Sequence, residues 1–199
     1  MRWLSFWRRH RPAAPPASEI RRSFEQAAAD EEHFPSTIDP RIYHVQLLLR
    51  YFGDLDGRRV ADVGCGKGRF ARVLLESHPQ ASLVAFDLAE AMLRCVPPGV
   101  SACMGSMTAL PFASGSFDAA YATESLEHAV DIEAAVSEMC RIVKPGGRIV
   151  IIDKNAEHWG KLQTPAWEKW FRREELEKLL RRDCSEVSSE YISYWEDVP

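Results

Sequence analysis

The stretch that decides the fold runs from Arg59 to Arg69 and reads RVADVGCGKGR. Its first half is a short apolar run in which the β-branched Val60 and Val63 suit a buried strand. Three glycines follow, and the apolar periodicity of the next segment, FARVLLESH, predicts a helix. Glycines suit such a turn because a side chain would hold the backbone away from a ligand, and because tight turns require positive φ. We therefore predict a ligand-binding turn at the carboxyl end of a strand.

A second predicted strand, SLVAFD, ends at Asp87, which comes 19 residues after Gly68. A carboxylate at this place can accept hydrogen bonds from both hydroxyls of a ribose. The glycine spacing is G-x-G-x-G, whereas a turn that binds a dinucleotide pyrophosphate reads G-x-G-x-x-G. The sequence therefore predicts a nucleoside pocket without the dinucleotide fingerprint.

The segment from Asp62 to Gly68 resembles the first motif of the class I S-adenosylmethionine-dependent methyltransferases, an acidic residue followed by G-x-G-x-G. The resemblance continues in the family's order through Asp87, through GSMTALPFASGSFDAAYATESLEH (105–128) and through RIVKPGGRIVIID (141–153). It is strongest to the small-molecule branch that includes the ubiquinone and menaquinone biosynthesis methyltransferases. It implies an enzyme that transfers a methyl group from S-adenosylmethionine to oxygen or carbon of a small-molecule or lipid-like acceptor.

The resemblance also implies roles for the residues of the glycine turn. Gly64, Gly66 and Gly68 would let the backbone approach the methionine and ribose portions of the cofactor. Asp62 would orient the turn and the cofactor's amino group, and Asp87 would bind the ribose hydroxyls.

Further cofactor contacts are implied by the strand ends that follow. Leu88 would pack on the adenine. Ser106 stands where aspartate is common, so a hydrogen bond to the adenine amino group would come through its hydroxyl. Met107 would add a backbone N–H and an apolar wall, and Glu124 would border both the cofactor and the acceptor.

Glu124 and His128 are the candidates for acid–base chemistry on the acceptor. They follow the fourth predicted strand at positions i and i+4, so they would share a face if this turn is helical. Because His128 titrates near neutrality, it can take a proton from a hydroxyl acceptor as a general base. A helix-capping or packing role for His128 is an equal alternative.

Strand and helix patterns alternate along the chain. The predicted strands cover 59–63, 82–87, 100–104, 117–122 and 148–153, and the predicted helices cover 69–78, 89–95, 132–143 and 172–182. This alternation predicts an α/β fold, a Rossmann-like and mostly parallel sheet with helices on both faces. One more strand is predicted within 186–196. Since the resembled family carries seven strands, we expect a sheet shortened at its C-terminal edge.

The N-terminal part divides into a basic, aromatic and proline-rich tail at 1–17 and a methyltransferase domain at 18–199 that begins with helices. Ser18 would cap the first helix and Pro40 would open the second. The resemblance implies that these helices cover the cofactor. Residues 1–11 combine tryptophans with arginines, which leaves two interpretations: a disordered tail, or an anchor with weak peripheral membrane contact.

Composition fits one domain of ordinary globular make-up, with 199 residues, 46% of them hydrophobic and 27% charged. Five scattered cysteines without a C-x-x-C pair indicate neither a disulfide framework nor a metal site, and they favour a cytoplasmic protein. No apolar run approaches the ~20 residues of a membrane span. Beyond residues 1–11 the chain has 21 basic and 29 acidic residues, so no nucleic-acid partner is expected. The oligomeric state stays open.

Two other functions stay open at this point. One is a non-catalytic protein that binds S-adenosylmethionine, which the shortened C-terminal edge and Ser106 favour. The other is a methyltransferase acting on RNA or protein, which the acidic composition disfavours.

Overall fold

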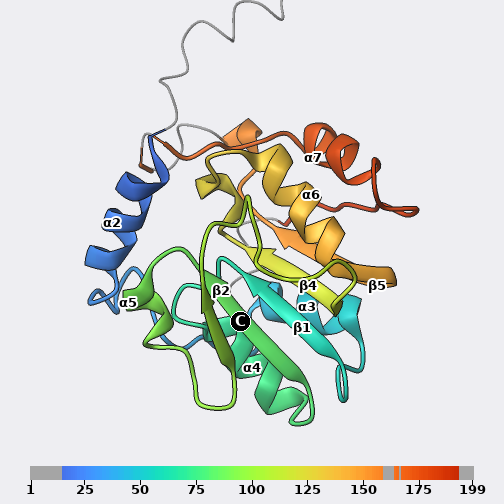
Figure 1. The fold of residues 1–199 in the computed structure, drawn as a ribbon, viewed down its shortest axis with the longest axis horizontal. Coiled ribbons are helices and arrows are strands. Elements are labelled where there is room, and N and C mark those ends of the chain that lie inside the picture. The colour runs from blue at the N-terminus through green and yellow to red at the C-terminus, as the bar shows by residue number, and fades with distance from the viewer. Residues whose placement is uncertain (1–14, 159–163, 166, 193–199) are drawn as a thin grey trace, which may run out of the picture.

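A five-stranded parallel sheet forms the centre of the protein (Figure 1). In this computed structural model, residues 15–158, 164–165 and 167–192 are described. The strands are β1 (Arg59–Val63), β2 (Ser82–Asp87), β3 (Ser101–Met104), β4 (Phe117–Thr123) and β5 (Val143–Ile152). Their order is β3-β2-β1-β4-β5, and every neighbouring pair is parallel. The order reverses between β1 and β4, which is where open α/β sheets bind their ligands.

Helices cover both faces of this sheet (Figure 1). They are α2 (Ala17–Ala27), α3 (Tyr43–Phe52), α4 (Arg69–Ser77), α5 (Glu90–Leu93), α6 (Ile132–Ile142) and α7 (Arg173–Leu180), with the short 3-10 helices η1 (Leu126–His128) and η2 (Ala156–His158). One core cluster packs α3 and α4 against Val60 and Tyr121, and another packs α6 against Ala61 and Ala120. The predicted Rossmann-like fold class is therefore confirmed.

The strand β5 begins five residues before the predicted 148. Val143 already pairs with Phe117, and after a register shift the regular ladder resumes between Arg148 and Ala119. The turn between these two pairings carries Gly146 with a φ of 77°. The sequence pattern located the regular part of this strand and missed the irregular beginning.

The N-terminal helices begin at other residues than predicted. Helix α2 starts at Ala17, directly after Pro16, so Ser18 lies inside the helix and does not cap it. The proline fixes its own φ at −61° and ends the extended segment there. Helix α3 starts at Tyr43 and not at Pro40, because Asp39 accepts the Arg41 N–H at 2.9 Å and holds a turn before the helix.

The strand predicted within 186–196 is wrong for residues 186–192, which form no strand. Side chains hold this segment instead: Glu190 accepts the Tyr51 hydroxyl at 2.7 Å and pairs with Arg50, both on α3. Residues 193–196 and the whole 1–11 segment lie outside the described part of the chain.

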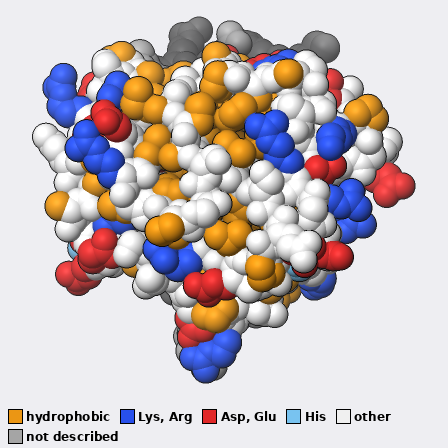
Figure 2. Space-filling model, turned by 60° about the horizontal axis from the view of Figure 1, so that its bottom comes forward, with side chains coloured by type: hydrophobic (Ala, Val, Ile, Leu, Met, Phe, Trp, Pro, Cys, Tyr) orange, Lys and Arg blue, Asp and Glu red, His pale blue; other side chains and the backbone are white. Residues whose placement is uncertain are grey.

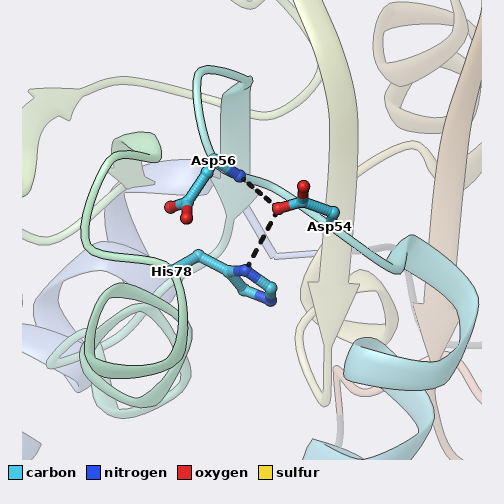
Figure 3. A group of neighbouring side chains, drawn as sticks. All are labelled: Asp54, Asp56 and His78. Carbon is cyan, nitrogen blue, oxygen red and sulfur yellow. Dashed lines mark hydrogen bonds and ion pairs between the residues drawn. The ribbon is translucent and has the colours of Figure 1, made fainter.

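Two loops are tied together at the end of the sheet opposite the ligand-binding edge (Figure 3). Asp54 Oδ1 accepts the Asp56 N–H at 2.9 Å and lies 3.7 Å from His78 Nδ1. Asp56 in turn accepts the Gln80 N–H at 2.9 Å. Because these carboxylates already bind backbone N–H groups, their role is to fasten the loop before β1 to the loop before β2.

The surface seen in Figure 2 mixes both signs of charge around a central area of hydrophobic side chains. This face therefore presents no broad basic field. Among the helices that the structure describes, none combines the length and the apolar character needed to cross a bilayer.

Candidate active site

The turn between β1 and α4 is built from glycines with positive φ. Gly64, Gly66 and Gly68 have φ values of 77°, 53° and 74°. A Cβ on Gly64 would lie 2.4 Å from Ser125 Cβ, so packing requires glycine there. A Cβ on Gly66 would meet nothing within 4 Å, because this residue borders open space. Gly66 is thus the position at which the backbone itself faces the cavity.

Asp87 holds this turn in place from the end of β2. Its Oδ2 accepts the Gly66 N–H at 2.8 Å, and its Oδ1 accepts the Ala89 N–H at 2.9 Å. Desolvation raises the pKa of Asp87 above its ordinary range, against the effect of these hydrogen bonds. Each carboxylate oxygen keeps a second lone pair, so the side chain can brace the turn and accept a ligand hydroxyl at once.

Asp62 lies below the turn, on β1. It is 3% exposed and pairs in register with Tyr121 of β4. Burial raises its pKa to about 7. Its Oδ2 makes no hydrogen bond of normal geometry to the described residues, although the Tyr121 hydroxyl lies close enough to interact with this carboxyl group and oppose the rise in its pKa. A buried carboxyl group with so little compensation is costly, so a ligand that brings a donor would stabilise it.

A cavity of about 400 Å³ opens over the carboxyl ends of β1, β2 and β4. Its size lies within the range of ~300–1,000 Å³ that is usual for small-molecule sites. Most of the predicted site residues line it: Asp62, Gly64, Gly66, Asp87, Leu88, Ser106, Met107, Glu124 and His128. Gly68 is not among the lining residues; it is the N-cap of α4, and a Cβ there would lie 3.0 Å from Pro97 Cδ.

The N-terminal segment closes one side of the cavity, as the resemblance implies. Phe24 of α2 packs edge-on against His128, with ring centroids 4.9 Å apart. Lys67, inside the glycine turn, reaches out to Glu31 Oε1 at 2.6 Å, although its own side chain is only 1% exposed. Glu25 accepts two backbone N–H groups at the start of α5. No residue of α3, which the structure describes completely, lines the cavity.

The segment after β4 is not the predicted helical turn. Glu124 has a φ of 50°, and only Leu126–His128 form a 3-10 helix. Glu124 therefore does not share a helical face with His128; its Oε2 lies 2.6 Å from the Arg69 guanidinium. Ser106 is engaged locally, with its hydroxyl 2.8 Å from Thr108 Oγ1. The roles of these residues toward a ligand remain predictions.

A charged cluster lines the same cavity as the glycine turn. Lys154 Nζ lies 2.9 Å from Glu127 Oε1 and 3.2 Å from Glu168 Oε2. Both carboxylates are almost fully buried, and burial raises the pKa of Glu127 to about 7. His128 Nε2 lies 3.7 Å from the same Glu127 oxygen. Burial lowers the pKa of His128 to about 4, which keeps the ring neutral near pH 7.

Glu127, His128 and Glu168 place three ligand atoms within 4.8 Å of one another. Such a set can hold a metal ion, but the Lys154 ammonium already lies at ion-pair distance from both carboxylates. A cation there would have to displace it. We assign no metal to this cluster.

Sequence reasoning missed Lys154, Glu168 and Lys67. Lys154 could have been predicted, because it follows the end of a parallel strand, where ligands bind. Glu168 belongs to no sequence motif, and only the tertiary fold brings it to the cavity. Asp153, next to Lys154, has a structural role: its carboxylate accepts the N–H groups of Leu126 at 2.9 Å and of Lys154 at 2.7 Å.

Known proteins share this arrangement of turn and strand ends. A family model described as a methyltransferase domain matches residues 61–151. The chain is 32% identical over 162 residues to a demethylmenaquinone methyltransferase of Renibacterium salmoninarum, spanning 76% of this chain and 66% of that protein. The chain belongs to the class I S-adenosylmethionine-dependent methyltransferases. The resemblance inferred from the glycine motif is thereby confirmed.

A second methyltransferase relative is the 2-methyl-6-phytyl-1,4-hydroquinone methyltransferase of Synechocystis, 31% identical over 157 residues that span 71% of this chain and 47% of that protein. The chain spans 35–66% of the length of the curated relatives compared. Among solved structures, the cyclase SpnF superposes with a TM-score of 0.71 at 20% identity, covering 86% of this chain and 73% of that one. This last likeness shows the fold alone.

Gly66→Ala should abolish cofactor binding while leaving the protein folded. The added methyl meets no protein atom within 4 Å but projects into the space proposed for the ligand. The left-handed φ costs about 1–2 kcal/mol of stability. Gly53→Ala is a matched control, since Gly53 has a φ of 64° and equally open surroundings far from the cavity. Calorimetric titration with S-adenosylhomocysteine measures the affinity of both variants. Equal affinities would contradict the placement of the cofactor at Gly66.

Asp62→Asn should change how stability depends on pH. The pKa of Asp62 rises from an ordinary 3.8 to about 7 on folding. The folded state therefore holds the proton more tightly, and stability falls as pH rises between these values. Because asparagine cannot ionise, the variant should gain on the order of 4 kcal/mol over the wild type between about pH 4 and pH 8.

Chemical denaturation at the two pH values measures this gain. Asp118→Asn is the control with the opposite sign, because the Arg59 N–H and then Lys144 lower the pKa of Asp118. Relative to the wild type, the Asp118→Asn variant should lose more stability at the higher pH than at the lower pH. A parallel pH dependence of the Asp62 variant and the wild type would refute a buried, proton-binding carboxyl.

Proposed function

We propose that this chain transfers a methyl group from S-adenosylmethionine to a small-molecule or lipid-like acceptor. The observation that carries the proposal is the convergence of Gly66, Asp87 and the buried Asp62 carboxyl group on one cavity at the sheet's switch point. These residues fit the cofactor, since they offer an unobstructed backbone, a carboxylate for ribose hydroxyls and an acceptor for an amino group.

Gly64, Gly66, Asp62 and Asp87 would hold the cofactor, with Leu88 and Met107 as apolar walls at its adenine. When bound, the cofactor supplies an electrophilic methyl on a sulfonium. The chain's contribution is to hold acceptor and methyl in line, and positioning of this kind accounts for several kcal/mol, about 7 or more at best, of a reaction barrier.

His128 is the residue that we propose as general base. Its side chain is 15% exposed and lines the cavity. Its Nδ1 is buried and has no partner among the described residues, and its Nε2 lies 3.7 Å from Glu127 Oε1. Burial lowers the pKa of the ring to about 4, and a negative oxygen held beside the ring would raise this pKa and so strengthen His128 as a base. Glu124 borders the same cavity, but its ion pair with Arg69 supports a positioning role and not a second base.

The acceptor class is supported by the names of the relatives. They include a demethylmenaquinone methyltransferase and a 2-methyl-6-phytyl-1,4-hydroquinone methyltransferase, the second named for a hydroquinone that carries a phytyl group. In this chain, Phe24, Phe34, Trp167 and Pro35 provide apolar lining beside the polar cluster. A cavity with one apolar and one polar wall suits an acceptor of that kind.

We further propose a cytoplasmic protein that contacts membranes through residues 1–11. Four arginines in this segment can meet anionic lipid at ~1 kcal/mol each, and two tryptophans suit the headgroup region. The full chain should cosediment with anionic vesicles more than with neutral ones, and less in high salt. A chain beginning at Ser18 should lose this binding. If both chains sediment equally with anionic vesicles at low salt, residues 1–11 do not bind membranes and the anchor proposal is wrong.

Asp87→Ala tests the proposed cofactor site most simply. The truncation removes a charged acceptor from the ribose hydroxyls and also frees the Gly66 N–H, so affinity for S-adenosylhomocysteine should fall by about 1.5–3 kcal/mol. Asp118→Ala is the control, because Asp118 likewise accepts a backbone N–H, at 2.8 Å from Arg59, but lies outside the cavity. Calorimetry that finds no binding to the wild type, or equal binding to both variants, rejects the site.

A further inference from the structure

Lys154 is a cation held at the cavity wall by two buried carboxylates. Its Nζ lies 2.9 Å from Glu127 Oε1 and 3.2 Å from Glu168 Oε2. The side chain of Lys154 is 26% exposed, whereas those of Glu127 and Glu168 are 0% and 3% exposed. The carboxylates therefore lie behind the ammonium, and the ammonium is the charge that a molecule in the cavity would meet.

The exposed part of the ammonium is the part that such a molecule would contact. Its three N–H donors face three carboxylate oxygens, both oxygens of Glu168 at 3.3 and 3.2 Å and Glu127 Oε1 at 2.9 Å, so an oxyanion would share one of these donors. Two basic residues at the glycine turn also line the cavity, and each forms an ion pair with a carboxylate. Lys67 pairs with Glu31, and Arg69 pairs with Glu124. Lys154 is thus the cation available beside His128.

Lys154 and His128 adjoin each other through Glu127. The same Glu127 Oε1 lies 2.9 Å from Lys154 Nζ and 3.7 Å from His128 Nε2. A hydroxyl group placed against the pair would meet a neutral base and a fixed cation at once. This combination removes a proton and stabilises the negative oxygen that remains.

Resting on the function proposed above, we infer that Lys154 binds the acceptor as an oxyanion, so that the acceptor is an acidic hydroxyl compound such as a phenol or an enol. The O–H bond breaks, its proton goes to His128, and its electron pair stays on the oxygen beside Lys154. That oxygen, or a ring carbon conjugated with it, then forms the new bond to the methyl group while the bond from the methyl group to the sulfonium sulfur breaks, and the electron pair of that bond stays on the sulfur of the departing S-adenosylhomocysteine. Where a ring carbon is methylated, its own proton is then lost to water. The proton leaves from His128 to Glu127 or to water.

The same geometry disfavours a cationic acceptor. A protonated amine would face the Lys154 ammonium directly, while the carboxylates that could attract it are covered. Like charges at contact distance in a poorly solvated site repel strongly. Lys154 would therefore determine specificity for the class of acceptor as well as support proton removal.

The probe that we choose is 4-nitrophenol, whose ionised form absorbs at a longer wavelength than its neutral form. The full chain is saturated with S-adenosylhomocysteine, and the probe is added below its own solution pKa. Binding should bring up the phenolate band and lower the apparent pKa of the bound probe. Protonated 4-nitrobenzylamine, of similar shape and opposite charge, should bind at least about tenfold more weakly.

Variants assign the effect to the charge of residue 154. Lys154→Arg should keep the phenolate band, and Lys154→Gln should lose it with a roughly tenfold or greater loss of probe affinity. Because Lys154→Gln leaves two buried carboxylates without their cation, the double variant Glu127→Gln with Lys154→Gln provides a second test that removes one charge of each sign. Lys144→Gln is the matched control, since Lys144 pairs with Asp118 outside the cavity.

The outcomes separate this inference from the proposed function. If S-adenosylhomocysteine does not bind in calorimetry, the proposed function fails. If it binds, and the probe then stays neutral, fails to bind, binds equally to the folded glutamine variants, or binds less well than the amine, the role of Lys154 is wrong and the cofactor site stands.

Discussion

The hydrogen bond from the Gly66 N–H to Asp87 is the contact on which the rest of the site depends. It joins the turn after β1 to the end of β2 at 2.8 Å, at the level where the strand order reverses. Gly64 packs against Ser125, which lies just after β4, the other strand that neighbours β1, so the turn is held from both sides. Because the backbone around Gly66 is held rigidly and is free of side chains, a ligand can approach it closely.

Buried acidic groups lie around this turn, and their burial lowers the stability of the folded protein. Asp62 and Glu127 are both removed from water, and burial raises the pKa of each to about 7. Such groups reduce the stability of the empty protein near neutral pH. Lys154 compensates Glu127 in part, whereas Asp62 interacts with the Tyr121 hydroxyl and has no cation at ion-pair distance among the described residues. The residues that lower stability are thus also those placed to interact with a ligand, a pattern expected where function opposes stability.

Much of the fold could be predicted from the sequence, because it depends on local signals. Strands β1 and β2 have their predicted bounds, since short β-branched and aromatic runs flanked by turn residues identify buried parallel strands. The missed features depend on tertiary contacts. Glu190 binds α3 through its side chain where a strand was predicted, and the irregular pairing of Val143 extends β5 beyond its hydrophobic run.

The candidate site divides in the same way. Asp62 and Asp87 lie at the carboxyl ends of β1 and β2, and Gly66 lies in the turn after β1, so their meeting at one edge follows from parallel topology. The spacing of four would place Glu124 on one face with His128 only in a helical turn; Glu124 has a φ of 50° instead, and its side chain pairs with Arg69. Glu168 reaches Lys154 from a segment 14 residues farther along the chain, and no sequence motif marks it.

The central claim is that this cavity transfers a methyl group and does not merely bind a nucleoside. The most direct measurement incubates the full chain with S-adenosylmethionine carrying a trideuterated methyl group and a native metabolite extract, followed by mass spectrometry. The account predicts a product labelled with that methyl group on a hydroxylated, apolar acceptor, formed together with S-adenosylhomocysteine. Tight binding of the cofactor with no labelled product would contradict the account and indicate a non-catalytic binding protein.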